Sequence, residues 1–199
     1  TQAPAAAPQA RPWSVREPVM HRACIWLEDA QEPPRIHSVR EESFGFRELG
    51  VKGGRLTLNG QPVALFGYTG VGTYWNYDLQ ADATALKLQQ VDLFRAMNAV
   101  AFRGHMEPLT RKWLDLCDRH GVLVVCEFPN FPDVQRLLKG CDLSPYERPL
   151  FWENLKREAA GMIACRANHP SIVAWSASNE GNGFGDWERA NLVPHVKGL

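Results

Sequence analysis

Short apolar segments alternate with longer helical ones from residue 63 onward, and this alternation restricts the fold more than any other feature. Residues 122–126 are apolar throughout, which is typical of a strand covered on both faces. Strands are expected at 63–66, 99–102, 122–126 and 171–175, with helices at 82–97, 108–120 and 147–167. Successive strand–helix units build a parallel sheet with right-handed crossovers. The pattern predicts an α/β fold, either part of a (β/α)8 barrel or a doubly wound sheet.

Polar side chains follow three of these strands directly. Arg103 and His105 come after the second strand, Glu127 after the third, and Asn179 and Glu180 after the fourth. Because the strands are parallel, these side chains gather at one edge of the sheet, where barrel enzymes place their sites.

The loop after the first strand separates the two folds. A doubly wound nucleotide-binding sheet needs a glycine-rich phosphate turn there, followed by a helix. Residues 67–72 contain glycines, but Tyr74, Trp75 and Tyr77 stand where that helix would begin. The loop therefore favours the barrel.

Structural roles compete with functional ones for most of these residues. Glu127 ends an apolar strand and could be an ion-pair partner of Arg103, while Arg103 and His105 could cap the barrel rim. The three loop aromatics could pack against the loop itself. Glu180, which follows a buried strand and precedes Gly181, has little structural purpose, so a functional role is expected for it.

The first 48 residues have a different texture. Residues 1–12 are rich in Ala, Pro and Gln, as in a linker or frayed end, and residues 13–48 look like the last strands of a β-sandwich. Residues 21–27 alternate, which places Cys24 and Trp26 on one face. Residues 55–62 are expected to form a hairpin, with Asn-Gly at its type I′ turn. The barrel segment is assigned to residues 49–199.

Composition excludes several classes of partner and site. With 22 basic and 22 acidic residues, the chain lacks the basic surplus that nucleic-acid or anionic-membrane binding needs. No stretch approaches the ~18 apolar residues of a membrane span, and residues 1–12 do not resemble a signal peptide. A soluble protein is expected, in an undetermined compartment. The five cysteines have no zinc-binding spacing; Cys117, Cys126 and Cys165 are expected to be buried free thiols.

Four ordered motifs resemble glycoside hydrolase family 2. They are Phe-Gly-Phe-Arg-Glu at 44–48, Leu-Asn-Gly-Gln-Pro at 58–62, the run ending in Val-Val-Cys-Glu at 114–127, and Asn-His-Pro-Ser through Ser-Asn-Glu at 168–180. The resemblance implies the first half of a TIM barrel, preceded by the end of an immunoglobulin-like domain. It also implies a retaining, exo-acting β-glycosidase with carbohydrate as its partner and no cofactor.

The resemblance carries roles to individual residues. Glu180 matches the family's acid/base, Asn179 the amide that binds the sugar's 2-hydroxyl, and Arg103 and His105 residues near the −1 subsite. Glu127 falls at an acidic or amide position, and Tyr74 and Trp75 are further candidates for substrate contact. The nucleophile, a second Glu on the seventh strand, lies outside this chain. An acid of this kind needs a raised pKa, which burial at a strand end would provide.

Departures from the family pattern also carry information. The run from residue 98 to residue 105 is two residues longer than the family's Asn-x-(Val/Ile)-Arg-x-His, and the loop from residue 68 lacks the His-rich stretch of β-galactosidases. Phe-Pro-Asn-Phe-Pro at 128–132 replaces their metal ligands, so no metal is expected. Two alternatives remain: a non-catalytic carbohydrate-binding fragment, and another barrel glycosidase family. A half barrel is also expected to self-associate through its open edges.

Overall fold

The computed structural model describes residues 10–70, 84–105, 108–129, 147–179 and 188–199. Glu180, Tyr74, Trp75, Tyr77 and the first nine residues of the linker assigned to 1–12 therefore lie outside the described residues. The expectations for those positions stay predictions.

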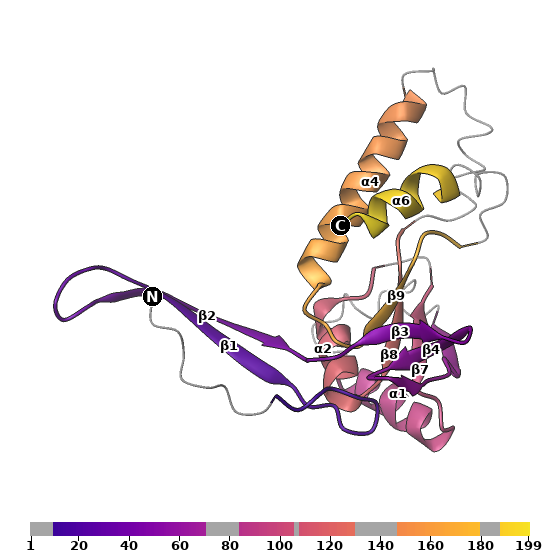
Figure 1. The fold of residues 1–199 in the computed structure, drawn as a ribbon, viewed down its shortest axis with the longest axis horizontal. Helices are drawn as coiled ribbons and strands as arrows, with labels where there is room; N and C mark the ends of the chain where they lie inside the picture. The colour runs from indigo at the N-terminus through magenta and orange to yellow at the C-terminus, as the bar shows by residue number, and fades with distance from the viewer. Residues whose placement is uncertain (1–9, 71–83, 106–107, 130–146, 180–187) are drawn as a thin grey trace.

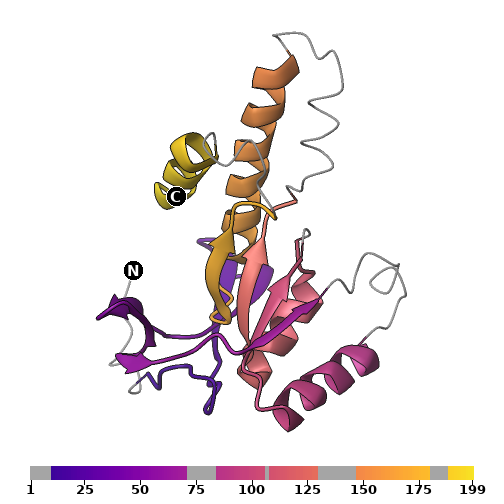
Figure 2. The same ribbon diagram turned by 90° about the vertical axis from the view of Figure 1, so that its right-hand side faces the viewer.

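A four-stranded parallel sheet forms the centre of the fold. Its strands lie in chain order: β6 (Gly67–Gly70), β7 (Ala101–Gly104), β8 (Leu123–Glu127) and β9 (Ile172–Ser176). The connecting helices are α1 (Thr84–Ala96), α2 (Arg111–His120) and α4 (Glu147–Arg166); a π-helix η1 (Glu188–Leu192) and α6 (Val193–Lys197) follow. Figure 2 shows the strands fanning side by side with α1 at one flank and α4 extending beyond the far end. The predicted α/β fold with the first strands of a barrel is confirmed.

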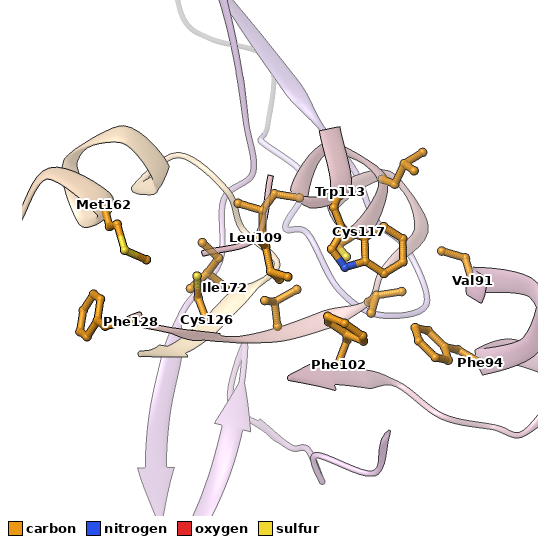
Figure 3. Close-up of a cluster of buried hydrophobic side chains, with 14 of the residues drawn as sticks. Val91, Phe94, Phe102, Leu109, Trp113, Cys117, Cys126, Phe128, Met162 and Ile172 are labelled. Carbon is orange, nitrogen blue, oxygen red and sulfur yellow. The ribbon is translucent and has the colours of Figure 1, made fainter. Parts of the chain in front are cut away.

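The main hydrophobic core lies between one face of the sheet and the helices. Alternation along the strands turns every second side chain to this face. Phe102, Cys126 and Ile172 meet Trp113 and other residues of α2 and α4 there (Figure 3). The opposite face carries Arg103 and Glu127 toward the carboxyl ends of their strands, and the buried Ala101 and Leu123 at the other ends.

A smaller core closes the amino-terminal end of the sheet. A three-stranded antiparallel ribbon, β3 (Leu49–Lys52), β4 (Arg55–Leu58) and β5 (Gln61–Pro62), packs there with buried Trp13, Leu58, Ala101 and Leu123. Asn59 and Gly60 both have positive φ, 52° and 75°, as a type I′ turn requires, so the predicted hairpin is confirmed.

Two long strands precede this ribbon. β1 (His21–Glu28) pairs antiparallel with β2 (Ile36–Phe44), and the pair projects away from the rest of the chain (Figure 1). Trp26 pairs with Val39 in the register, and both side chains are largely exposed. The predicted strands are present, while their place in an immunoglobulin-like domain stays a prediction.

The first barrel strand differs from its expected position. Residues 63–66 were expected to form it, but β6 begins at Gly67, and Val63 packs instead into the small core beneath the sheet. A Cβ at Gly67 would overlap the Ala101 carbonyl of β7, so glycine allows the close pairing. Tyr68 therefore lies in the strand and not in the loop that follows it.

The face of α1 that packs on the sheet carries Val91 and Phe94, while Leu93 and the following Met97 are exposed. One expectation about burial was wrong. Cys165 is exposed near the end of α4, whereas Cys117 and Cys126 are buried as predicted. None of the described helices combines the length and apolar character needed to cross a membrane.

Candidate active site

Three neighbouring strands bring polar side chains together at the carboxyl-terminal edge of the sheet. Arg103 of β7 pairs with Val125 in the register, and Glu127 of β8 pairs with Ser176 of β9. Residues two apart on a strand share a face, so Arg103, Glu127 and Ser176 point to the same side. Asn179 follows three residues after Ser176 and joins the group.

Arg103 and Glu127 form an ion pair. Arg103 Nη2 lies 2.6 Å and Nε 3.0 Å from Glu127 Oε2. The Glu127 side chain has no exposed surface, while Arg103 is 32% exposed. The ion pair with Arg103 that the sequence suggested for Glu127 is therefore confirmed. The guanidinium offsets the buried charge of Glu127, as a buried carboxylate requires. Its expected contact with substrate stays a prediction.

Asn179 is held by the same guanidinium. Arg103 Nη2 donates to Asn179 Oδ1 at 2.9 Å, across 76 residues of sequence. Asn179 is almost fully buried, with 8% of its surface exposed. Of the residues selected from the sequence, the structure thus joins Arg103, Glu127 and Asn179 in one network.

Ser176 belongs to this network and was not selected from the sequence. Its hydroxyl donates to Glu127 Oε2 at 2.7 Å, the same oxygen that Arg103 contacts. The usable signal is position: Ser176 ends β9 as Glu127 ends β8, and the two residues pair in the register.

His105 lies close by without joining the network. Its backbone N–H donates to the Gly70 carbonyl at 3.1 Å, which ties the end of β7 to that of β6. Its Nδ1 is buried and has no hydrogen-bond partner within the part of the chain that the structure describes. Glu180 follows Asn179 directly in the chain, and its own placement is outside the described residues.

A second polar cluster lies at the other end of β9. Asp118 Oδ2 accepts from His169 Nδ1 at 2.6 Å, and Asp118 Oδ1 accepts from the Ser171 N–H at 3.1 Å. With Asp115, this group has the atom types of a cation site. Both Asp118 oxygens are already engaged by protein donors, so the cluster is explained as a clamp on the start of the strand.

Two cysteines, Cys117 and Cys126, lie in the main hydrophobic core. Burial raises the pKa of the Cys126 thiol to about 11 and raises that of Cys117 well above its usual value. Both thiols are therefore held neutral at physiological pH, which suits packing and not nucleophilic chemistry.

The comparisons with known proteins agree with this geometry. The family profile described as "Glycosyl hydrolases family 2, TIM barrel domain" matches residues 49–199. A Streptococcus agalactiae β-glucuronidase is 31% identical over 154 residues, covering 73% of this chain and 25% of the relative. A Klebsiella pneumoniae β-galactosidase is 28% identical over 178 residues, covering 88% of this chain and 16% of the relative.

Solved structures extend the likeness to the fold. Bifidobacterium dentium β-glucuronidase, complexed with coumarin-3-O-glucuronide, has a TM-score of 0.74 at 27% identity and covers 94% of this chain and 30% of its own. The family 2 β-galacturonidase from Eisenbergiella tayi has a TM-score of 0.73 at 21% identity, covering 97% of this chain and 32% of its own, and shows the fold alone. The chain thus spans a third or less of each of these proteins. Together, the parallel sheet, the polar strand ends and the match over residues 49–199 establish that the chain belongs to glycoside hydrolase family 2.

Proposed function

We propose that this chain carries the acid/base part of a retaining, exo-acting β-glycosidase, with Glu180 as the proton donor. One observation carries the proposal: Arg103 holds Asn179 at the carboxyl-terminal edge of the sheet, and Glu180 is the next residue. Barrel enzymes act at that edge of the sheet, which supports a catalytic role for the residue that follows Asn179 in the sequence.

The proposed chemistry needs a carboxylic acid and a second carboxylate. The acid protonates the oxygen of the leaving group, and the second group attacks the sugar. Among the described strand-end residues the other carboxylate is Glu127, which is buried and ion-paired with Arg103. The resemblance implies a nucleophile on a seventh barrel strand and the described parallel sheet has four, so we propose that the nucleophile belongs to a longer protein, of which residues 13–48 contribute the end of an immunoglobulin-like domain.

The test compares leaving groups in the longer protein. Glu180→Gln should lower kcat/KM by ~10²–10⁴-fold on aryl β-glycosides with poor leaving groups, because these need protonation. Substrates with good leaving groups should lose far less in the glycosylation step. Glu153→Gln on the exposed surface of α4 is the matched control and should be silent. Full activity of Glu180→Gln on poor leaving groups would overturn the assignment.

The substrate is proposed only as a β-glycoside. The similar proteins are named for glucuronides, galactosides and galacturonate, and these names define the assay panel. Aryl β-glucuronide, β-galactoside and β-galacturonide should be compared at equal concentration. One substrate is expected to exceed the others in kcat/KM.

A second candidate function is carbohydrate binding without catalysis by the 199-residue chain itself. The observation in its favour is that Glu127, the described carboxylate at this edge of the sheet, has no exposed surface. Turnover by the longer protein together with binding but no turnover by the 199-residue chain would support this role. Turnover by the 199-residue chain would exclude it.

A further inference from the structure

We propose that Glu127 and Ser176 are positioning residues that lock Arg103, so that Asn179 can offer a substrate only its amide N–H donors. The inference rests on the proposed glycosidase function. It assigns the direction of the hydrogen bond at Asn179. It also assigns Glu127 and Ser176 a role in which they act on the substrate through Arg103 and Asn179.

The guanidinium decides which way the Asn179 amide faces. Arginine carries only donors, so the atom of Asn179 that lies 2.9 Å from Arg103 Nη2 is the oxygen. The reversed amide would set its own N–H groups against the guanidinium N–H groups with no acceptor between them. The Nδ2 group is therefore the end of Asn179 that is left to face a ligand.

Arg103 is itself held from one side. Nε and Nη2 both donate to Glu127 Oε2, at 3.0 and 2.6 Å, and Nη2 reaches Asn179 with its other hydrogen. The oxygens of Glu127 and Asn179 lie at two different points around the guanidinium, and together they fix its plane as well as its distance. A lysine at this position would supply the charge without the plane.

Ser176 completes the support of the carboxylate. Its hydroxyl is the third donor on Glu127 Oε2, at 2.7 Å, and comes from β9, the strand that also leads to Asn179. Glu127 has no exposed surface, so it meets the site through Arg103 and Ser176. The strands β7, β8 and β9 are thereby tied together next to Asn179.

The chemical consequence is a selective contact. A group that meets Asn179 must present a lone pair, as the oxygen of a sugar hydroxyl does, and a sugar with hydrogen at that position loses the contact. Binding energy from this donor is available as charge develops on the sugar, provided the amide is already oriented.

The experiment uses the longer protein and two aryl glycosides that differ only at the 2-position, one with hydroxyl and one with hydrogen. Asn179→Asp replaces the donors by oxygen but keeps an acceptor for Arg103. On the hydroxyl substrate its kcat/KM should fall ~10²–10³-fold, the typical effect of removing one donor. Asn179→Leu should lower the melting temperature.

Ser176→Ala and Glu127→Gln test the positioning roles. Each should reduce kcat/KM on the hydroxyl substrate, Glu127→Gln by ~10²-fold and Ser176→Ala by ~10-fold, effects of misplacement and not of lost contact. On the 2-deoxy substrate both losses should shrink below ~3-fold, because the contact they serve is absent. Ser176→Thr keeps the hydroxyl and should recover activity. Ser171→Ala, which removes a buried hydroxyl with no partner in the described residues, is the control and should be silent.

The outcomes separate the inference from the function it rests on. Equal losses on both substrates for Ser176→Ala and Glu127→Gln would make their role merely structural. An unchanged kcat/KM of Asn179→Asp on the hydroxyl substrate would mean that the amide N–H groups do not contact the substrate, and it would overturn the inference. Hydrolysis that responds to Glu180→Gln but not to these variants would overturn the inference and leave the proposed function standing. Absence of hydrolysis by the unaltered longer protein would overturn the function.

Discussion

Replacing Asp118 by alanine should loosen the start of β9 strongly. Asp118 is 2% exposed, and its carboxylate accepts from His169 Nδ1 at 2.6 Å and from the Ser171 N–H at 3.1 Å. Alanine removes the acceptor and leaves both donors buried. Each stranded donor costs ~1–3 kcal/mol, so the expected loss is ~2–6 kcal/mol. The whole free energy of unfolding of a typical domain is ~5–15 kcal/mol, so this loss would be a large share of it.

The graded variants sharpen this expectation. Asp118→Asn retains one carbonyl oxygen, which accepts from one of the two donors, while its amide N–H group faces the other donor. It should therefore lower the free energy of unfolding by ~1–3 kcal/mol. Asp115, on the same helix, lies 3.9 Å from His169 Nδ1 and is 35% exposed. Asp115→Ala should therefore change the free energy of unfolding by less than ~1 kcal/mol. It is the matched control.

Hydrogen exchange resolved to peptides measures the effect where it arises. In Asp118→Ala, the amides of Ser171 and the first residues of β9 should exchange faster by ~10-fold for each ~1.4 kcal/mol lost, down to the limit set by intrinsic exchange. Among the described residues, the β1–β2 hairpin makes no hydrogen bond to Asp118, so its amide exchange rates should be unchanged. Equal effects of Asp118→Ala and Asp115→Ala would refute the reasoning.

Three further outcomes are expected. Gly121→Ala should lower the free energy of unfolding by ~1–3 kcal/mol, because Gly121 ends α2 at φ 70° and a Cβ there would overlap Val15. Gly161→Ala, within α4 and facing open space, should raise the free energy of unfolding by ~0.5–1 kcal/mol. Thermal melts of the two variants should shift in opposite directions. Alkylation at pH 8, followed by mass spectrometry, should modify Cys24 and Cys165 well before Cys126, whose pKa of about 11 leaves about one thiol in a thousand ionised; raising the pH should increase the Cys126 rate, and equal rates in the folded protein would contradict the burial. The 199-residue chain should self-associate in sedimentation velocity, because Phe66 and Tyr68 at the open β6 edge are exposed, and a single monomeric species with a cooperative melt would contradict this.

The sequence predicted the fold best where periodicity was strong. The strand predicted at 122–126 is β8 at residues 123–127, and the helix predicted at 108–120 is α2 at residues 111–120. Both predictions came close because buried strands and helix ends have local chemical signatures. Prediction from the sequence failed at residues 63–66, which are as apolar as a barrel strand. What displaced that strand to Gly67 is a close approach to Ala101, and no local pattern records the backbone of a distant neighbour.

The candidate site divides in the same way. The sequence by itself determined which polar residues follow which strands, because strand ends and parallel order place Arg103, Glu127 and Asn179 at one edge. Only the tertiary structure decided that Glu127 is fully buried, that Ser176 joins it, and that Arg103 takes the Asn179 oxygen. Those relations depend on side-chain contacts between segments 24 to 76 residues apart, and contacts of that range arise from packing, which alternation and spacing do not encode.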